Sequence, residues 1–246
     1  MPRIYINESE IIDNTVVLEG ERAAHLSRSL RMRAGEGVTF CNGEKTDYEG
    51  VIEKITSSEV CVKILSSCVS PAEPPYRARL FMALPKADKM EMIVQKAVET
   101  GVFEIVPFIS ERCISRPDEA SGKKKVERWG KIAMSAAEQC GRGIIPKVHG
   151  IVPYKTALEM AKGDEIRFIC YECEKENSLR AKLEGLEDEE NPVISFFVGA
   201  EGGFSEDEVS LAEGYGISRV TLGSRILRCE TAPLFVLSVM SALLDE

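Results

Sequence analysis

Long apolar runs are missing from this chain of 246 residues. A membrane-spanning helix needs roughly 20 consecutive apolar residues, and no stretch of the sequence approaches that length. The first residues, Met-Pro-Arg-Ile-Tyr, have neither the apolar core nor the cleavage site of a secretory signal peptide. These absences argue against membrane spans and favour a cytoplasmic protein.

Histidines are also few. The chain has two histidines, His25 and His149, and eight cysteines, of which only Cys170 and Cys173 have the spacing of a zinc knuckle. A structural zinc site takes four ligands, and no second pair completes this one. Cysteines of cytoplasmic proteins are mostly reduced. We therefore expect free thiols and no metal site.

Basic residues are outnumbered, with 31 lysines and arginines against 40 acids and a net charge of −9. This balance argues against a general nucleic-acid binder. Residues 22–33 and 112–131 are nevertheless basic, while acids gather in a loop predicted at 184–191. The first stretch contains no acid and holds Arg22, His25, Arg28, Arg31 and Arg33. A basic face of this kind either binds phosphates or is a solvated helix surface.

The pattern of predicted elements changes along the chain. Residues 1–70 contain short runs of alternating polarity, which predict a small β-rich domain with one short helix at 21–31. Three prolines predict a linker over residues 71–77. From residue 78 to residue 246, strand-like runs alternate with helical patterns. This alternation predicts an α/β domain with a parallel sheet covered on both faces.

The central feature of the second domain is residues 193–231. An apolar run at 193–198 predicts a buried strand that leads directly into the glycine-rich residues 199–205. A second strand, predicted at 219–222, leads into another glycine-led loop at 223–231. Ligands of open α/β sheets bind at the carboxyl ends of the strands, and glycine lets a backbone approach a ligand closely. We therefore expect these two loops to form a ligand site.

The first loop differs from the common phosphate-binding motifs. Its Gly-x-x-Gly-Gly order is not the Gly-x-Gly-x-x-Gly of dinucleotide-binding folds, and it has no Walker lysine. Glu201 would repel a phosphate. Ser205 and Glu208 form a capping box that predicts a helix start directly after the loop. The loop therefore suits a cationic ligand or an uncharged base, with backbone groups that bind an adenine edge.

The last predicted helix, residues 231–244, is apolar nearly all round. Such a helix is expected to be buried on all sides. Tight packing within the chain or a subunit interface would provide that cover.

Several motifs resemble those of one enzyme family. Residues 197–205, Phe-Val-Gly-Ala-Glu-Gly-Gly-Phe-Ser, resemble the Gly-Pro-Glu-Gly-Gly-Phe-Ser loop of the SPOUT methyltransferases. Residues 222–232 resemble the Leu-Gly-x-Arg-Ile-Leu-Arg-x-Glu-Thr-Ala motif of one branch, the ribosomal RNA small-subunit uridine-N3 methyltransferases. Residues 83–91, 95–102 and 138–142 also look like motifs of this branch, so the resemblance spans the chain. Ala200 and Ser224 stand where the family often has proline.

The resemblance implies a trefoil-knotted α/β domain that follows a PUA-like β-barrel domain. It further implies S-adenosylmethionine as cofactor, a homodimer joined through the knot helices, and small-subunit ribosomal RNA or the small ribosomal subunit as partner. The RNA-binding residues would be the basic set of residues 22–33. The cofactor-binding residues would be Leu84, Pro85, Val198, Gly199, Ala200, Glu201, Gly202, Leu222, Gly223, Ile226, Leu227 and Arg228.

Methyl transfer to uracil N3 sets further requirements. The imide nitrogen carries a proton that must leave before it becomes nucleophilic, so a positioned base is needed. Glu201 and Glu230 are the candidate acceptors. Arg225 and Arg228 are candidates to stabilise negative charge on O2 or O4 of the ring. Helix capping by Glu230 and a carboxylate partner for Arg228 are the alternative, purely structural roles.

Three other functions remain open at this point. A SPOUT enzyme of this type could methylate another RNA position or a ribose 2′-hydroxyl. A ribosome-assembly factor could keep the fold without catalysis, although both glycine loops look intact. A dinucleotide-dependent oxidoreductase is the third alternative, and it lacks its fingerprint motif.

Overall fold

The computed structural model describes residues 1–186 and 189–245, so positions 187 and 188 of the predicted acidic loop lie outside the described residues. The chain divides into two units. The first consists of residues 1–73 and 137–145, and the second of residues 74–136 and 146–246. The sequence pattern assigns residues 137–145 to the second domain, whereas the structure places them in the first unit.

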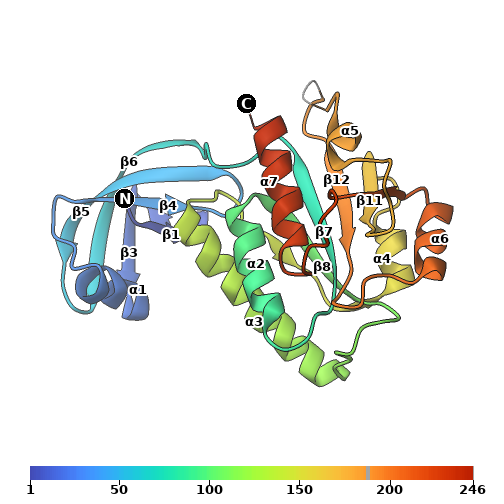
Figure 1. Ribbon diagram of the computed structural model, residues 1–246. Helices are drawn as coiled ribbons and strands as arrows, with labels where there is room; N and C mark the ends of the chain where they lie inside the picture. Colours follow the sequence, from blue (N-terminus) through green and yellow to red (C-terminus); the bar gives the residue numbers. More distant parts are fainter. Residues whose placement is uncertain (187–188, 246) are drawn as a thin grey trace. The chain divides into compact units, whose positions relative to one another are not determined.

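The first unit is rich in β-structure (Figure 1). Its elements are β1 (Arg3–Tyr5), the 3₁₀ helix η1 (Glu8–Glu10), β2 (Ile11–Ile12), β3 (Thr15–Glu19), α1 (Gly20–Ala24), the π-helical turn η2 (His25–Ser29), β4 (Gly37–Cys41), β5 (Thr46–Ile55) and β6 (Glu59–Val69). The strands form a six-stranded sheet with the order β1-β4-β5-β6-β3-β2. β1 is parallel to β4, and the other neighbouring strands are antiparallel.

The strands of this sheet bury one face because apolar side chains alternate along them. Val16 and Leu18 of β3 are fully buried, whereas Val17 between them is 47% exposed. The same core receives Val38, Phe40, Val60 and Val62 from β4 and β6. A period of two residues places alternate side chains on opposite faces. The predicted β-rich unit is therefore confirmed.

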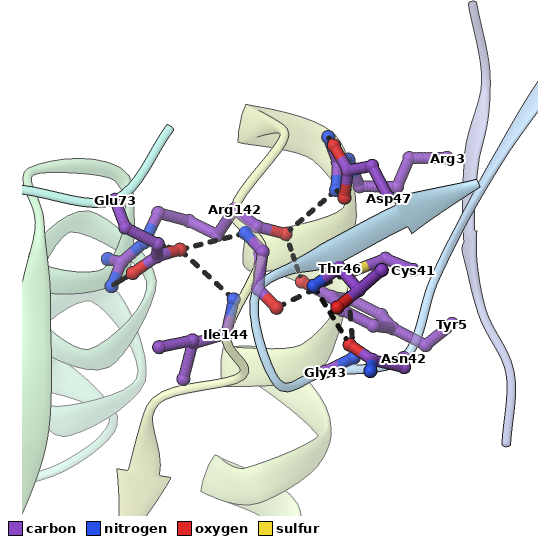
Figure 2. Close-up of polar contacts among 12 residues, drawn as sticks. Arg3, Tyr5, Cys41, Asn42, Gly43, Thr46, Asp47, Glu73, Arg142 and Ile144 are labelled. Atoms are coloured by element: carbon purple, nitrogen blue, oxygen red, sulfur yellow. Dashed lines mark hydrogen bonds and ion pairs between the residues drawn. The ribbon is translucent and has the colours of Figure 1, made fainter. Parts of the chain in front are cut away.

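A buried ion pair joins residues 137–145 to the rest of the first unit (Figure 2). The Arg142 guanidinium donates to both carboxylate oxygens of Glu73, through Nε at 2.9 Å and through Nη2 at 2.8 Å. The two side chains are only 4% and 5% exposed. Glu73 Oε1 also accepts from the backbone N–H groups of Gly143 at 2.8 Å and Ile144 at 3.0 Å. The Glu73 carboxylate therefore binds both the Arg142 guanidinium and two backbone N–H groups of this segment.

The backbone carbonyl of Arg142 is bound as well. It accepts a hydrogen bond of 2.6 Å from the Tyr5 hydroxyl and one of 3.4 Å from Arg3 Nη1. Arg3 also forms a bidentate ion pair with Asp47, in which both N···O distances are 2.6 Å. Burial raises the pKa of the Tyr5 hydroxyl. The hydroxyl therefore stays protonated at neutral pH and can donate.

The second unit is built on a parallel sheet. Its strands are β7 (Arg77–Ala83), β8 (Val102–Ile109), β9 (Lys147–Val148), β10 (Val152–Pro153), β11 (Ile166–Cys170), β12 (Val193–Val198) and β13 (Ser218–Val220). They follow the order β10-β8-β7-β12-β11-β13, and β9 pairs with β8. These pairings are all parallel. The predicted α/β fold is confirmed, while the trefoil knot stays a prediction.

The helices of the described chain after residue 77 are α2 (Lys89–Glu99), α3 (Glu119–Cys140), α4 (Tyr154–Met160), α5 (Leu179–Leu183), α6 (Glu206–Gly214) and α7 (Ala232–Leu244). Figure 1 shows α2 and α7 on one side of the parallel sheet and α4 and α6 on the other. The sheet is therefore covered on both faces, as the alternation of strands and helices predicts. Among residues 1–186 and 189–245, no helix combines the length and apolarity that crossing a membrane requires.

The prediction that the last helix is buried on all sides is wrong for the single chain. One face of α7, which includes Val236, Leu237 and Met240, is buried. α2 and α5 pack against the helix, and they leave another face uncovered. That face borders an apolar groove of about 400 Å³, lined by Arg180, Phe235, Ser238, Val239, Ala242 and Leu243.

We predict that Glu73→Gln strongly destabilises the first unit, because the buried Arg142 guanidinium would lose the charged carboxylate that it contacts through Nε and Nη2. Breaking a buried ion pair on one side costs about 3–5 kcal/mol. Urea unfolding, followed by the circular dichroism of the full chain, measures the change. The control is Glu59→Gln, which breaks the exposed Lys54–Glu59 pair, whose side chains are 66% and 37% exposed. Equal effects of the two variants would contradict the prediction.

Candidate functional site

A cavity of about 470 Å³ lies at the carboxyl ends of β11, β12 and β13. Both glycine loops border it, as does the start of α2, which follows β7. Its lining consists of Lys89, Cys170, Tyr171, Glu172, Val198, Gly199, Ala200, Glu201, Gly202, Gly203, Thr221, Leu222, Gly223, Ser224, Arg225, Ile226, Leu227, Arg228, Cys229, Glu230 and Ala232. The two loops that the sequence predicts as a ligand site therefore border one cavity.

The first glycine loop folds back on itself directly after β12. A Cβ atom on Gly199 would lie 2.9 Å from the Cα of Gly203, a distance that real Cβ atoms do not tolerate. Gly203 has φ +63°, in the left-handed region that glycine adopts without strain. A Cβ on Gly203 would also lie 2.7 Å from Glu172 Oε1. The loop is therefore compact because its glycines have no side chains.

The end of the first loop is anchored in the core. Phe204 is 1% exposed and stacks against Phe108 with ring centroids 6.3 Å apart. Ser205 and Glu208 then form the predicted capping box, in which each side chain accepts from the backbone N–H of the other residue. Glu208 Oε1 also accepts from the backbone N–H of Glu111 at 2.7 Å. These contacts hold the start of α6 and, through it, the loop.

The second loop is more open. Gly223 has φ +104°, and the side chains of Arg225, Ile226 and Arg228 are exposed. Ile226 is 86% exposed. Cys229, by contrast, is only 6% exposed. The loop therefore presents its arginines and one apolar side chain to solvent around a buried thiol.

Lys89 lies between the two loops. Its Nζ atom is 3.0 Å from Glu201 Oε1, in the first loop, and 3.1 Å from Glu230 Oε2, in the second. Glu201 also accepts from the backbone N–H of Lys86, at 3.2 and 3.3 Å. The Cys229 thiol donates to Glu230 Oε2 at 3.2 Å. The cavity therefore contains two carboxylates that share one ammonium group.

This pairing sets the protonation states. Burial tends to raise the pKa of Glu201, but hydrogen bonds from Lys89 and from backbone N–H groups outweigh it and lower that pKa. The pKa of Glu230 is lowered despite burial by the bonds from Cys229, its own backbone and Lys89. The Glu201 and Glu230 contacts raise the pKa of Lys89. Burial and the Glu230 carboxylate raise the pKa of Cys229 to about 12. At neutral pH both carboxylates are ionised and the thiol is protonated.

The structure brings most of the predicted site residues together. The four candidate catalytic residues, Arg225, Arg228, Glu201 and Glu230, all line the cavity. So do the predicted cofactor-binding residues Val198, Gly199, Ala200, Gly202, Leu222, Gly223, Ile226 and Leu227. Leu84 and Pro85 are buried and do not line it. Arg228 Nη1 lies 4.0 Å from Glu230 Oε1, so this arginine does face a carboxylate.

Nine lining residues were not predicted individually from the sequence as site residues: Lys89, Cys170, Tyr171, Glu172, Gly203, Thr221, Ser224, Cys229 and Ala232. Lys89 opens α2, four residues beyond Pro85. A signal for it was present, because residues 83–91 belong to the motifs that resemble the family. Tyr171 and Glu172 directly follow β11. The sequence does not show that β11 lies beside β12 in the sheet, and this neighbouring position is what brings Tyr171 and Glu172 to the cavity.

The predicted RNA-binding residues lie in the first unit. Arg22, His25, Arg28, Arg31 and Arg33 are all exposed. They occupy α1, η2 and the turn that follows. Arg22 is paired with Glu10 at 2.5 Å, whereas no ion pair of the described residues involves Arg28, Arg31 or Arg33. This surface therefore offers unpaired positive charge.

Metal ligands do not cluster in the described part of the chain. No group of three or more histidine, cysteine, aspartate or glutamate side chains there could hold a metal ion. All eight cysteines are free thiols, including Cys170 and Cys173.

Two family models match the chain. Residues 72–241 match the RNA methyltransferase domain, and residues 18–65 match the RNA methyltransferase PUA domain. The second match falls within the β-rich first unit. The first covers the parallel sheet and both glycine loops.

Full-length relatives agree with these matches. The ribosomal RNA small subunit methyltransferase E of Bacillus subtilis (strain 168) is 32% identical, over 92% of this chain and 90% of that protein. The protein of the same name from Mesomycoplasma hyopneumoniae (strain 232) is 31% identical, over 97% of this chain and 98% of its own. A crystal structure of that enzyme from Neisseria gonorrhoeae, bound to S-adenosyl methionine, has a TM-score of 0.84 and 34% identity, over 99% of this chain and 98% of its own. The chain belongs to the ribosomal RNA small subunit methyltransferase E family of RNA methyltransferases.

Proposed function

We propose that this protein transfers a methyl group from S-adenosylmethionine to N3 of a specific uridine in small-subunit ribosomal RNA, on the assembled subunit and in the cytoplasm. The observation that carries the proposal is the cavity between the two glycine loops, with its paired carboxylates and arginines. Relatives named for methylation of small-subunit ribosomal RNA support the substrate class. The cofactor-bound relative from Neisseria gonorrhoeae supports the cofactor.

The residues of the cavity fit this cofactor. Its volume of about 470 Å³ falls within the roughly 300–1,000 Å³ of small-molecule sites. We expect the adenine edge to be bound by backbone groups of the lining residues Gly199, Gly202, Leu222, Gly223, Ile226 and Leu227. The ionised Glu201 favours a cationic ligand over a phosphate. When bound, S-adenosylmethionine supplies an activated methyl group on a positively charged sulfur.

A carboxylate of the cavity accepts the proton of uracil N3. Either Glu201 or Glu230 accepts it: the N3–H bond breaks, the proton passes to a carboxylate oxygen, and the electron pair stays on the ring. Because both carboxylates are ionised at neutral pH, each can act as acceptor. Arg228 is 83% exposed, so its guanidinium is free to turn toward O2 or O4 and stabilise the developing charge. Arg225, on the same loop, is the second candidate for that role.

The first unit binds the RNA. Its exposed arginines at positions 28, 31 and 33 contact phosphates, and the matching PUA domain model supports this role. The second unit forms a homodimer through the uncovered apolar face of α7. Burial of that face would remove apolar surface from water, which favours association.

The first prediction concerns the reaction. The protein is incubated with radiolabelled S-adenosylmethionine and small ribosomal subunits from cells that lack this enzyme, and the labelled nucleosides are separated by chromatography. We expect a single labelled nucleoside, 3-methyluridine. Of the variants Glu201→Gln and Glu230→Gln, the one that removes the proton acceptor slows transfer by about 10²- to 10⁴-fold. Glu213→Gln, on the surface of α6, is the control.

The other outcomes distinguish the alternatives. Label in a 2′-O-methylated or another nucleoside would keep the cofactor and refute the uridine N3 target. Absence of label from subunits, free RNA and precursor particles, despite measurable cofactor binding, would indicate a binding protein instead of an enzyme.

A second prediction concerns RNA affinity. Arg28→Ala weakens binding to small subunits and makes the slope of log K against log salt shallower by about 0.7 to 0.9, because one fewer counterion is released. The affinity for S-adenosylmethionine stays unchanged. Filter binding over a salt series measures the first quantity, and calorimetry measures the second. Lys54→Ala, an exposed change elsewhere in the first unit, is the control. A parallel loss of cofactor affinity would refute this division of labour.

The third prediction concerns assembly. Val239→Glu places a charge on the uncovered face of α7 and converts the dimer to monomers in size-exclusion chromatography with light scattering. Leu211 on α6 is 42% exposed, and Leu211→Glu makes a similar change at another exposed apolar site. We expect that variant to remain dimeric. A wild-type monomer would contradict the proposed dimer.

A further inference from the structure

We propose that Lys89 is a positioning residue that holds Glu201 and Glu230 at the cavity as a pair of ionised carboxylates. The inference rests on the proposed methyl transfer, because it names the residue that prepares the proton acceptor. Its basis is geometric: one ammonium group contacts a carboxylate from each glycine loop, at 3.0 and 3.1 Å.

The position of Lys89 in the fold suits this role. It is the first residue of α2, so its backbone is fixed by a helix whose next turn, at Met90, Ile93 and Val94, is buried in the core. Glu201 and Glu230, by contrast, lie in loops. A charge carried by a packed helix can therefore fix two loop side chains in place. Precise placement of catalytic groups depends on support of this kind.

The two carboxylates require a nearby positive charge to stay ionised together, and Lys89 supplies it. Two carboxylates near the same point repel each other, and without a neighbouring positive charge one of them takes up a proton. Lys89 is 31% exposed, and its partners are 29% and 14% exposed. This partial burial limits screening by water. Lys89 therefore keeps both groups ionised and within its reach.

Other groups near the pair do not replace Lys89. The Arg228 guanidinium is 4.0 Å from Glu230 and 83% exposed, which makes it a loose partner. The Cys229 thiol lies 3.9 Å from Lys89 Nζ and donates to Glu230, but it is uncharged at neutral pH. Glu201 also accepts from the backbone N–H of Lys86, but a backbone N–H group has only a partial positive charge. The remaining titratable groups that line the cavity are Cys170, Tyr171, Glu172 and Arg225.

The consequence is a defined pH dependence. A cation that lowers a carboxylate pKa extends the ionised form to lower pH. Without the cation that pKa rises, and the ionised acceptor is lost at a higher pH. Loss of Lys89 therefore moves the acidic limb of the rate profile to higher pH. At high pH the acceptor is ionised with or without Lys89, so the rate there returns to that of the wild type.

The test compares Lys89→Met, Lys89→Arg and the wild type in single-turnover methylation at saturating S-adenosylmethionine, from acidic to alkaline pH. An opposite charge at this distance shifts a carboxylate pKa by about one unit or more. Lys89→Met should therefore move the acidic limb up by about one pH unit, which is about a tenfold rate loss on that limb. Lys89→Arg should retain most of the wild-type profile. Lys96→Met, which breaks a half-buried pair with Glu99 on the same helix, should leave the pH profile unchanged.

A second readout does not depend on activity. Titration of ¹³C-labelled glutamate side chains by NMR, with signals assigned from Glu201→Gln and Glu230→Gln, reports the two pKa values directly. A higher pKa for either carboxylate in Lys89→Met supports the inference, even if the wild type methylates no uridine and the proposed function fails. Unchanged titrations, or a uniform rate loss with no shift in the profile, would overturn it. If Lys89→Met does not fold, a wild-type profile and wild-type carboxylate titrations in Lys89→Gln would overturn it equally.

Discussion

The close backbone contact between Gly199 and Gly203 is the constraint on which the second unit depends. It turns the chain back within one residue of the end of β12 and leaves Glu201 at the turn. Phe204 can then return to the core, and α6 begins one residue after the Ser205 cap. A Cβ on Gly199 would force Gly203 away, and a side chain on Gly203 would strain its positive φ and meet the Glu172 carboxylate. The cavity, its carboxylate and the following helix therefore follow from one backbone approach.

Charged groups occupy both ends of the parallel sheet, but they differ in how far they pair with one another. Near the amino ends of the strands, Arg79 of β7 lies 2.6 Å from Asp164 and 3.3 Å from Glu104. His149 contacts the same Glu104 at 2.9 Å. These groups pair with each other, and none of them lines the cavity. At the carboxyl ends the pairing is incomplete, because two arginines of the second loop extend into solvent. These exposed arginines are therefore available to a ligand.

Local sequence signals predicted the parts of the site that the chain builds locally. Each strand–glycine transition, and the capping box at Ser205, depends on residues that are close together in the sequence. Lys89 and Glu172 could not be found in this way, because strand order alone brings them beside the glycine loops. The uniform apolarity of α7 concealed which of its faces the chain covers. Residues 137–140 are the end of α3, and nothing in the local sequence shows that residues 137–145 contact Glu73.

That tie has a consequence for synthesis of the protein on the ribosome. Glu73 is made early, whereas Arg142, Gly143 and Ile144 emerge 69 to 71 residues later. Until then the strands of the first unit can pair, but the carboxylate lacks its charge partner and its backbone donors, and an unpaired charge is costly to bury. The first unit, although it begins at the amino terminus, is therefore completed only after β7, α2, β8 and the whole of α3 have been made. Its folding does not follow the order of translation.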